Sequence, residues 1–190
     1  MQADVSASAD VDRFVPQAAQ ALGGVDILVS CAGVFPQALI EDITDEDWSR
    51  VMRINLDGAF YACRAAAPYL KKSGKNGRII NLASQAALNG TAHGAHYGAS
   101  KAALLGLTYC LAKELGPDGI TVNAILPGRI DTEMLAYATP ERRAQWLQST
   151  PLGRFGDTAD IAELTVFLAS DKGGYITGAK INVNGGLSTG

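Results

Sequence analysis

A tyrosine and a lysine lie four positions apart in the stretch AHYGASKAAL, where a glycine-rich segment leads into an apolar one. Residues four apart share one face of a helix, so the side chains of Tyr97 and Lys101 are close enough to interact. A lysine cation beside a phenol favours the phenolate, which predicts a Tyr97 pKa below its usual value of about 10. Such a phenol can act as a general acid or base near neutral pH.

Ser84 provides a second hydroxyl, at the end of the apolar run RIINLAS. A hydroxyl at this point can donate a hydrogen bond to a carbonyl or alkoxide oxygen that Tyr97 also contacts. The pair therefore suits proton transfer to or from an alcohol oxygen. The Tyr-Lys spacing alone is weak evidence, because such spacings of common residues arise by chance on helices.

Four short runs are rich in β-branched residues and end on small residues or on glycine and proline, as strands do. Their continuous apolar character predicts strands buried on both faces of a parallel sheet. The runs are VDILVSCAG (25–33), RIINLAS (78–84), ITVNAILPG (120–128) and KINVNGG (180–186).

Longer segments with helical spacing alternate with these runs, at 9–22, 44–70, 97–115 and 158–170. This alternation predicts an α/β fold of the Rossmann-like type: an open, doubly wound parallel sheet with helices on both faces, in one domain over residues 1–190.

Polar residues mark two of the predicted helix starts. Thr44 with Asp47 resembles a capping pair, and Asp157 or Thr158 can cap the last long helix. A short helix is also expected in LAYATPERRAQWLQSTPLGRFG, either as a lid over a ligand or as a packing element.

Composition excludes several classes of protein. No apolar run reaches the roughly 18 residues that span a bilayer, and the start of the chain lacks the features of a secretory signal. Basic residues are scattered and outnumbered by acids, which argues against nucleic acid as a partner. We therefore expect a cytoplasmic protein.

Neither histidines nor cysteines predict a metal site. His93 and His96 lie three apart with no Cys, Asp or Glu nearby to complete a ligand set. The three cysteines, Cys31, Cys63 and Cys110, lack a CxxC spacing and are expected to be buried, reduced thiols.

In an open parallel sheet, ligands bind at the carboxyl ends of the strands. The residues at those positions are CAG (31–33), Ser84 and PGRIDT (127–132). Together with the YxxxK pair, thirteen residues after Ser84, they resemble the motifs of the short-chain dehydrogenase/reductase family. VSCAG is similar to the family's NNAG element, and RINLDGAF places Asn55 at the family's fourth catalytic position. Several motifs in order are more specific than any one of them.

The resemblance implies hydride transfer between NAD or NADP and a carbonyl or secondary alcohol. Tyr97 would be the acid/base, Lys101 would lower its pKa and bind the nicotinamide ribose, and Ser84 would orient the substrate oxygen. Asn55 would hold a water linking Lys101 to solvent. The implied cofactor contacts, from the adenine to the nicotinamide end, are Asp4, Val5, Ser30, Ala32, Gly33, Tyr97, Lys101, Pro127, Gly128, Ile130 and Thr132.

Simpler interpretations exist for some of these residues. Asn55 is also explained as a helix breaker that satisfies local backbone groups, Thr132 and Asp131 as caps of the following turn, and Asp4 as a solvated acid near the terminus.

Within the family the chain most resembles 3-oxoacyl-acyl-carrier-protein reductases, through GRIINLAS, VNAILPGRIDTEM and YITGAKINVNGG. Sugar and polyol dehydrogenases share these features. The expected substrate pocket contains Gln85, Asn89, Arg129 and Met134. Family members are commonly homodimers or homotetramers, and a homo-oligomer is expected here.

The start of the chain departs from the family, whose members begin with a strand and a TGxxxGxG turn that binds the pyrophosphate. ADVS (3–6) resembles the family's third strand, which predicts a domain that lacks about 60 residues of two βα repeats. We then expect VDILVS to be an edge strand and residues 1 to about 24 to be poorly anchored or rearranged. Ser30 and Cys31 also replace two asparagines.

Two other functions fit parts of the pattern. The chain could be a catalytically silent, truncated form or scaffold that cannot hold a dinucleotide. A nucleotide-sugar epimerase shares YxxxK, although little chain follows Lys101 to form a separate substrate domain.

Overall fold

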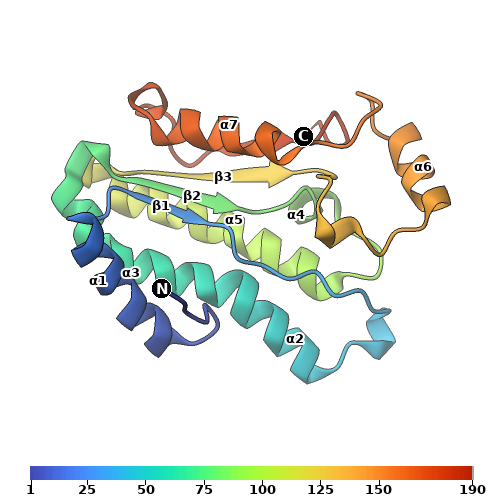
Figure 1. Cartoon of the computed structure of the whole chain (residues 1–190), viewed down its shortest axis with the longest axis horizontal. Helices are drawn as coiled ribbons and strands as arrows, with labels where there is room; N and C mark the ends of the chain where they lie inside the picture. Colours follow the sequence, from blue (N-terminus) through green and yellow to red (C-terminus); the bar gives the residue numbers. More distant parts are fainter. Residues whose placement is uncertain (190) are drawn as a thin grey trace.

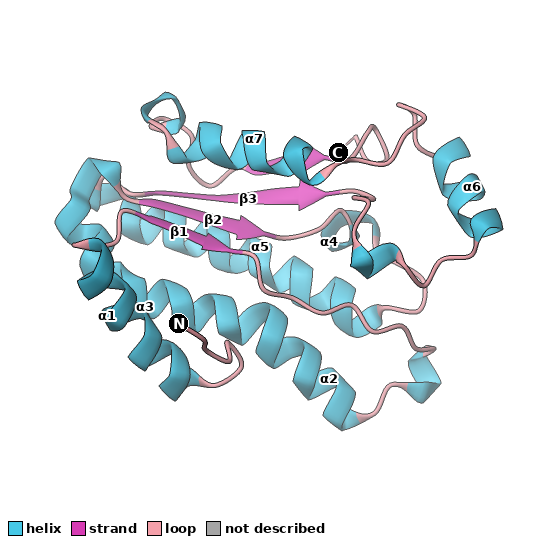
Figure 2. Cartoon of the chain, viewed as in Figure 1, coloured by secondary structure: helices cyan, strands magenta, loops and turns pink. Residues whose placement is uncertain are grey.

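The computed structural model describes residues 1–189 and contains a parallel sheet with the strand order β1-β2-β3-β4. The strands are β1 (Ile27–Ser30), β2 (Arg78–Leu82), β3 (Thr121–Pro127) and β4 (Lys180–Val183). Helices α1, α3 and α5 cover one face of the sheet and α7 covers the other (Figure 1). The predicted α/β architecture, with helices on both faces, is therefore confirmed (Figure 2).

All helices except the short α4, which was not predicted, fall close to the predicted segments. They are α1 (Ser8–Leu22), α2 (Asp45–Met52), α3 (Gly58–Ser73), α4 (Ala86–Asn89), α5 (Ala95–Leu115), α6 (Pro140–Gln148) and α7 (Thr158–Ala169). Within the described residues, no helix combines the length and the apolar character needed to cross a bilayer.

The two outer strands differ from the prediction. β2 is buried throughout and β3 at all but its last residue, but exposed and half-buried residues alternate along β1 and β4. A strand is buried on both faces only where helices cover both faces of the sheet and other strands flank it. Helix α7 packs on β2 and β3, and the outer strands β1 and β4 each have one neighbouring strand. Ile27 and Val29 consequently remain 46% and 41% exposed. The prediction that β1 is an edge strand is confirmed.

The N-terminal segment is anchored through α1, so one of the two predicted alternatives, a poorly anchored start, is wrong for this helix. Val11, Val15 and Ala19 are buried, and this side of α1 packs against α3. Arg64 of α3 also contacts Asp12 at 3.2 Å. The apolar residues on one side of α1 are sufficient to anchor this helix, because α3 offers a complementary apolar surface. Residues 3–6 form no strand, and a turn begins at residue 5.

The predicted helix over 44–70 is not uniform. It begins as expected, with the Thr44 hydroxyl accepting a hydrogen bond from the Asp47 amide at 3.1 Å. Between α2 and α3, however, residues Arg53–Asp57 form a π-helix that contains Asn55. Such π-helical turns are rare and frequently mark functional sites.

Only one cysteine behaves as predicted. Cys63 is buried in α3, and burial raises its pKa to about 12. Cys31 and Cys110 are free but exposed, so the prediction of buried thiols is wrong for both. Cys31 follows the edge strand β1, and Cys110 lies on α5 on a side that no other element buries.

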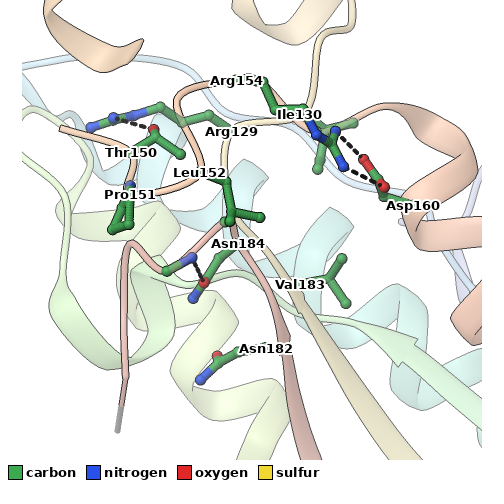
Figure 3. Close-up of a pocket in the computed structure, with 13 residues that line it drawn as sticks. Arg129, Ile130, Thr150, Pro151, Leu152, Arg154, Asp160, Asn182, Val183 and Asn184 are labelled. Carbon is green, nitrogen blue, oxygen red and sulfur yellow. Dashed lines mark hydrogen bonds and ion pairs between the residues drawn. The ribbon is translucent and has the colours of Figure 1, made fainter. Parts of the chain in front are cut away.

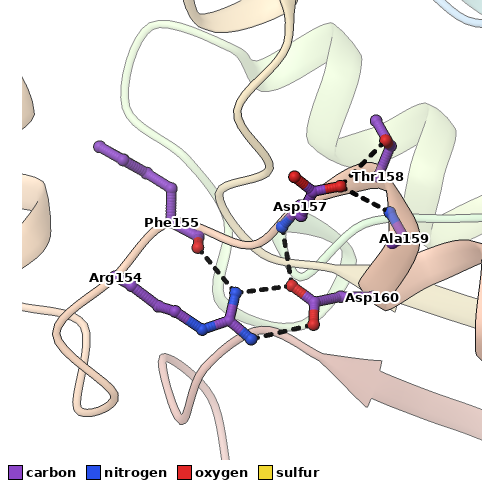
Figure 4. A network of polar contacts seen from close by, with 6 residues as sticks. All are labelled: Arg154, Phe155, Asp157, Thr158, Ala159 and Asp160. Atoms are coloured by element: carbon purple, nitrogen blue, oxygen red, sulfur yellow. Dashed lines mark hydrogen bonds and ion pairs between the residues drawn. The ribbon is translucent and has the colours of Figure 1, made fainter.

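Helix α7 begins with a capping box centred on Asp157 (Figure 4). The Asp157 carboxylate accepts from the Ala159 amide at 2.9 Å, and the Asp160 carboxylate accepts from the Asp157 amide at 2.7 Å. Arg154 donates two further hydrogen bonds to Asp160, which hold that carboxylate in place and lower its pKa to about 2. Asp157 is thus the cap, and Thr158 only donates to it.

Asp157→Ala is expected to lower the free energy of unfolding by about 1 kcal/mol, since it removes an N-cap acceptor. Urea denaturation followed by circular dichroism measures the change. Asp157→Asn keeps an acceptor oxygen and should be close to wild type; equal losses in the two variants would contradict the capping role.

Candidate active site

A cavity of about 530 Å³ opens at the carboxyl ends of the strands. Its wall includes most of the residues predicted from the sequence: Gly33, Ser84, Tyr97, Lys101, Pro127, Gly128, Ile130 and Thr132. They end or follow β1, β2 and β3 or lie on α5, and parallel strands bring their carboxyl ends to one edge of the sheet. Chain segments far apart in sequence therefore converge on this cavity.

Tyr97 and Ser84 also line a second, smaller cavity of about 360 Å³. Both side chains are largely buried, with residues 9% and 8% exposed. The Ser84 hydroxyl accepts from the Ala86 amide at 3.1 Å, which orients it. The Tyr97 ring packs on Phe35, with 4.4 Å between ring centroids. The two hydroxyl-bearing residues thus lie where the two cavities meet.

Lys101 is buried one turn of α5 beyond Tyr97 and is only 5% exposed. Its Nζ donates to the Leu82 carbonyl at 2.7 Å and lies 5.9 Å from the centre of the Tyr97 ring. Burial lowers the Lys101 pKa to about 8, although the nearby Cys31 shifts this pKa in the upward direction. Lys101 lines the larger cavity, and its Nζ would lie 3.4 Å from a Cβ on Gly33.

Tyr97 does not have the lowered pKa that the sequence predicts. Burial raises the pKa of its phenol, and the Ser84 hydroxyl opposes this shift. Lys101 makes no hydrogen bond to the phenol, because its Nζ is directed to the backbone of β2. Desolvation therefore dominates over the lysine cation in this structure.

Asn55 connects three parts of the site from its π-helical turn. Its Oδ1 accepts from the Val34 amide at 2.8 Å, and its Nδ2 donates to the Val34 carbonyl at 3.0 Å and to the Ser100 hydroxyl at 3.1 Å. The backbone groups it satisfies are distant in sequence, unlike those of a local helix breaker. A Cβ on Gly33 would lie 3.4 Å from both Asn55 Oδ1 and Lys101 Nζ, so these groups converge on Gly33.

Not all predicted cofactor residues reach the main cavity. Val5, Ser30 and Ala32 line an adjoining cavity of about 480 Å³, which shares Val29 and Cys31 with the first. The Asp4 carboxylate lines none of these cavities and instead accepts from the amide and hydroxyl of Ser6. The simple interpretation of Asp4 as a surface acid fits this contact better.

The smaller cavity contains residues that the sequence did not single out. Gln85, Arg129 and Met134 line it as expected, whereas Asn89 does not and its side chain accepts from Ser188. The unexpected members include four aromatic or basic residues, Phe35, Tyr137, Arg142 and Trp146. Three of these lie in or just before α6, which therefore borders the site, as the lid interpretation requires.

A further cavity of about 400 Å³ lies between the segment after α6 and the end of β4 (Figure 3). Of the residues predicted for the site, Ile130 and Arg129 lie in its wall. Arg129 extends towards Thr150 there, and Arg154 pairs with Asp160. Neither Tyr97 nor Ser84 borders it, so it is separate from the proton-transfer groups.

The lowered Lys101 pKa predicts a pH dependence of stability. The unfolded lysine binds a proton below its ordinary pKa of 10.5, and the folded one only below about 8. Between these values the unfolded chain carries more protons, so the free energy of unfolding should rise as pH increases from about 8 to about 10. Urea titrations of wild type and Lys101→Met measure this slope. The variant should lack it, and parallel pH profiles would contradict the prediction.

Known proteins resemble the chain over most of its length. A family model described as enoyl-(acyl carrier protein) reductase matches residues 1–188. The chain is 38% identical to 3-oxoacyl-[acyl-carrier-protein] reductase from Thermotoga maritima, over 93% of the chain and 72% of that protein. It is 40% identical to (3R)-3-hydroxyacyl-CoA dehydrogenase from Rattus norvegicus, over 98% and 72% respectively.

Solved structures agree with this relationship. A short-chain dehydrogenase/reductase (glucose/ribitol dehydrogenase) from Brucella melitensis superposes with a TM-score of 0.94 at 38% identity, over 100% of this chain and 76% of that one. A blue fluorescent protein from a metagenomic library, solved with NADPH, superposes with a TM-score of 0.92 at 41% identity, over 99% of this chain and 75% of that one. Fold, motif residues and relatives together show that the chain belongs to the short-chain dehydrogenase/reductase family of NAD(P)-dependent oxidoreductases.

Proposed function

We propose that this chain transfers a hydride between NAD(P) and a carbonyl or secondary alcohol, with Tyr97 moving the accompanying proton. The observation that carries this proposal is the position of Tyr97 and Ser84 at the boundary of two cavities. One cavity contains the buried Lys101, and the other offers a separate space for a substrate.

The larger cavity fits the nicotinamide end of a dinucleotide. No acidic residue lines it among residues 1–189, and Lys101 has N–H groups left after its bond to Leu82. Lys101 and Tyr97 would hold the ribose, and Ile130 and Thr132 would contact the nicotinamide. When bound, the cofactor supplies a hydride to the carbonyl carbon or accepts one from the carbinol carbon.

The chain's own groups complete the reaction. During reduction the carbonyl oxygen gains negative charge, and the Tyr97 hydroxyl gives it a proton. Ser84 donates a hydrogen bond to the same oxygen, and the Lys101 cation stabilises the phenolate that remains on Tyr97. In oxidation the proton moves in the reverse direction, from the substrate hydroxyl to the Tyr97 phenolate. Asn55 positions the Gly33 backbone beside Lys101, and we propose that it also binds a water linking Lys101 to solvent.

The names of two relatives support a finer proposal, the reduction of a 3-oxoacyl group.

We also propose a homodimer or homotetramer formed through α5 and β4. The outward face of α5 leaves Tyr109 38% exposed and Cys110 exposed, and β4 is an edge strand.

Titration with NADH and NADPH, followed by nicotinamide fluorescence, tests cofactor binding. We expect saturable binding by wild type that is lost in Lys101→Ala. Lys113→Ala is the matched control, since Lys113 is exposed on the same helix. Absence of saturation up to millimolar cofactor would overturn the proposal and favour the catalytically silent form.

A further inference from the structure

The smaller cavity, beside Tyr97 and Ser84, carries two arginines, and no acidic side chain lines it within residues 1–189. Arg129 follows β3, and Arg142 belongs to the first turn of α6. The remaining wall is aromatic, apolar or uncharged polar. A substrate in this cavity would therefore meet positive charge that no carboxylate in the wall offsets.

Arg142 is held by aromatic rings and has no ionic partner. Its guanidinium carbon lies 5.8 Å from the Tyr137 ring centre and 5.3 Å from that of Trp146. Within the described residues, no carboxylate lies within 4 Å of it and its side chain makes no hydrogen bond. Stacking fixes the plane of a guanidinium but leaves the N–H groups at its edge free to donate. Arg142 is thus oriented and unpaired.

Arg129 is anchored more firmly, again without a carboxylate. Its Nη1 donates to the Trp146 carbonyl and to the Ser149 hydroxyl, both at 2.8 Å, and its guanidinium also lies over the Trp146 ring. Nη2 and Nε make no hydrogen bond within residues 1–189. Its charge therefore also remains available to a ligand.

A row of aromatic contacts connects these arginines to the phenol. The rings of Tyr97 and Phe35 are 4.4 Å apart, and those of Phe35 and Tyr137 are 6.5 Å apart. Tyr137 then contacts Arg142. The positive group and the proton-transfer group consequently lie within one small cavity, a few ring widths apart.

We propose that the substrate is a short oxo or hydroxy acid, bound with its carbonyl or carbinol between Tyr97 and Ser84 and its carboxylate on Arg142. This inference rests on the proposed hydride transfer, and it takes the 3-oxoacyl group as a free acid rather than as the thioester of the two relatives' names. A guanidinium edge matches a carboxylate with two parallel N–H···O bonds, and Arg129 adds positive charge nearby. The volume of about 360 Å³ is at the lower end for ligand pockets, which favours an acid of a few carbons.

Steady-state kinetics with a matched substrate pair and a matched variant pair test the inference. The substrates are 3-oxobutyrate and its uncharged methyl ester. Arg142→Gln should raise KM for the acid by about 10- to 100-fold, the usual range for a lost charge-assisted hydrogen bond, and leave KM for the ester unchanged. Arg143→Gln removes the same charge one residue away, where Arg143 pairs with Asp131 outside the cavity. It should change neither KM.

Two kinetic outcomes would overturn the inference. Equal effects of Arg142→Gln and Arg143→Gln on the acid would indicate a general field effect. A wild-type preference for the methyl ester, or for the N-acetylcysteamine thioester of the same acid, would place an uncharged acyl group at Arg142.

A binding measurement separates this inference from the proposed function. The chain has two tryptophans, so Trp48→Phe leaves Trp146 as the reporter beside Arg142. We expect 3-hydroxybutyrate to change its fluorescence saturably, and Arg142→Gln to abolish the change. Saturation without turnover of acid or ester supports the carboxylate site and contradicts the proposed function. Turnover of the ester without a saturable fluorescence change supports the proposed function and overturns the carboxylate site. Binding of inorganic phosphate as tightly as the acid would also overturn the carboxylate site.

Discussion

Tyr97→Phe is expected to lower kcat by about 10²- to 10⁴-fold, the range typical of a lost general acid or base. The phenylalanine keeps the ring that packs on Phe35, and Ser84 keeps its hydrogen bond from the Ala86 amide. The fold should therefore be unchanged while the proton-transfer group is absent. Steady-state rates of carbonyl reduction at saturating cofactor measure the effect.

Tyr109→Phe is the matched control, because it makes the same change on an exposed residue of the same helix. It should retain wild-type activity. The raised Tyr97 pKa also predicts how the rates depend on pH. The protonated phenol, which donates the proton during reduction, persists through neutral pH. Oxidation needs the phenolate, so its rate should increase towards alkaline pH. A Tyr97→Phe protein with more than about a tenth of wild-type kcat would contradict the role.

Asn55→Ala is expected to have the largest effect on stability, about 2 to 4 kcal/mol, since a buried backbone group left unpaired costs about 1 to 3 kcal/mol. The substitution orphans both the amide and the carbonyl of Val34 and removes a donor to Ser100. Asn55 is only 1% exposed and Val34 is half-buried, so water could replace these bonds only in part without rearrangement. Denaturant titrations followed by circular dichroism measure the loss.

Ser100→Ala provides a comparison, because it removes only one of the three partners of Asn55. Its cost should be clearly smaller. Asn55→Ala should also weaken NADH binding, since Val34 adjoins Gly33 in the wall of the larger cavity. An Asn55→Ala protein as stable as Ser100→Ala would show that Asn55 does not support this loop.

Much of the architecture was predictable because strand and helix periodicities are local. The alternation of β-branched runs with helical segments, and the polar caps Thr44 and Asp157, depend on neighbours within a few residues. Placing Ser84, Tyr97 and Lys101 in one cavity then required only the rule that parallel strands end at one edge.

The remainder depends on partners distant in sequence. Whether Ile27 is covered depends on the position of α7, and whether α1 is anchored depends on the surface of α3. Arg142 belongs to a short polar helix whose sequence does not indicate that it folds back over Tyr97. The raised Tyr97 pKa likewise follows from burial, which the spacing of Tyr97 and Lys101 does not specify.

The register of the sheet has a consequence for folding kinetics. Ile27 pairs with Arg78, Arg78 with Thr121, and Ala124 with Lys180, so each strand must find a neighbour across a long intervening segment. No pair of strands is a hairpin that could form early and locally. Loop-closure entropy must be overcome before each pairing contributes, and proteins dominated by such contacts fold in milliseconds to seconds. The helices are therefore expected to form first and the sheet to assemble late, with β2 and β3 exposed to aggregation in the interval.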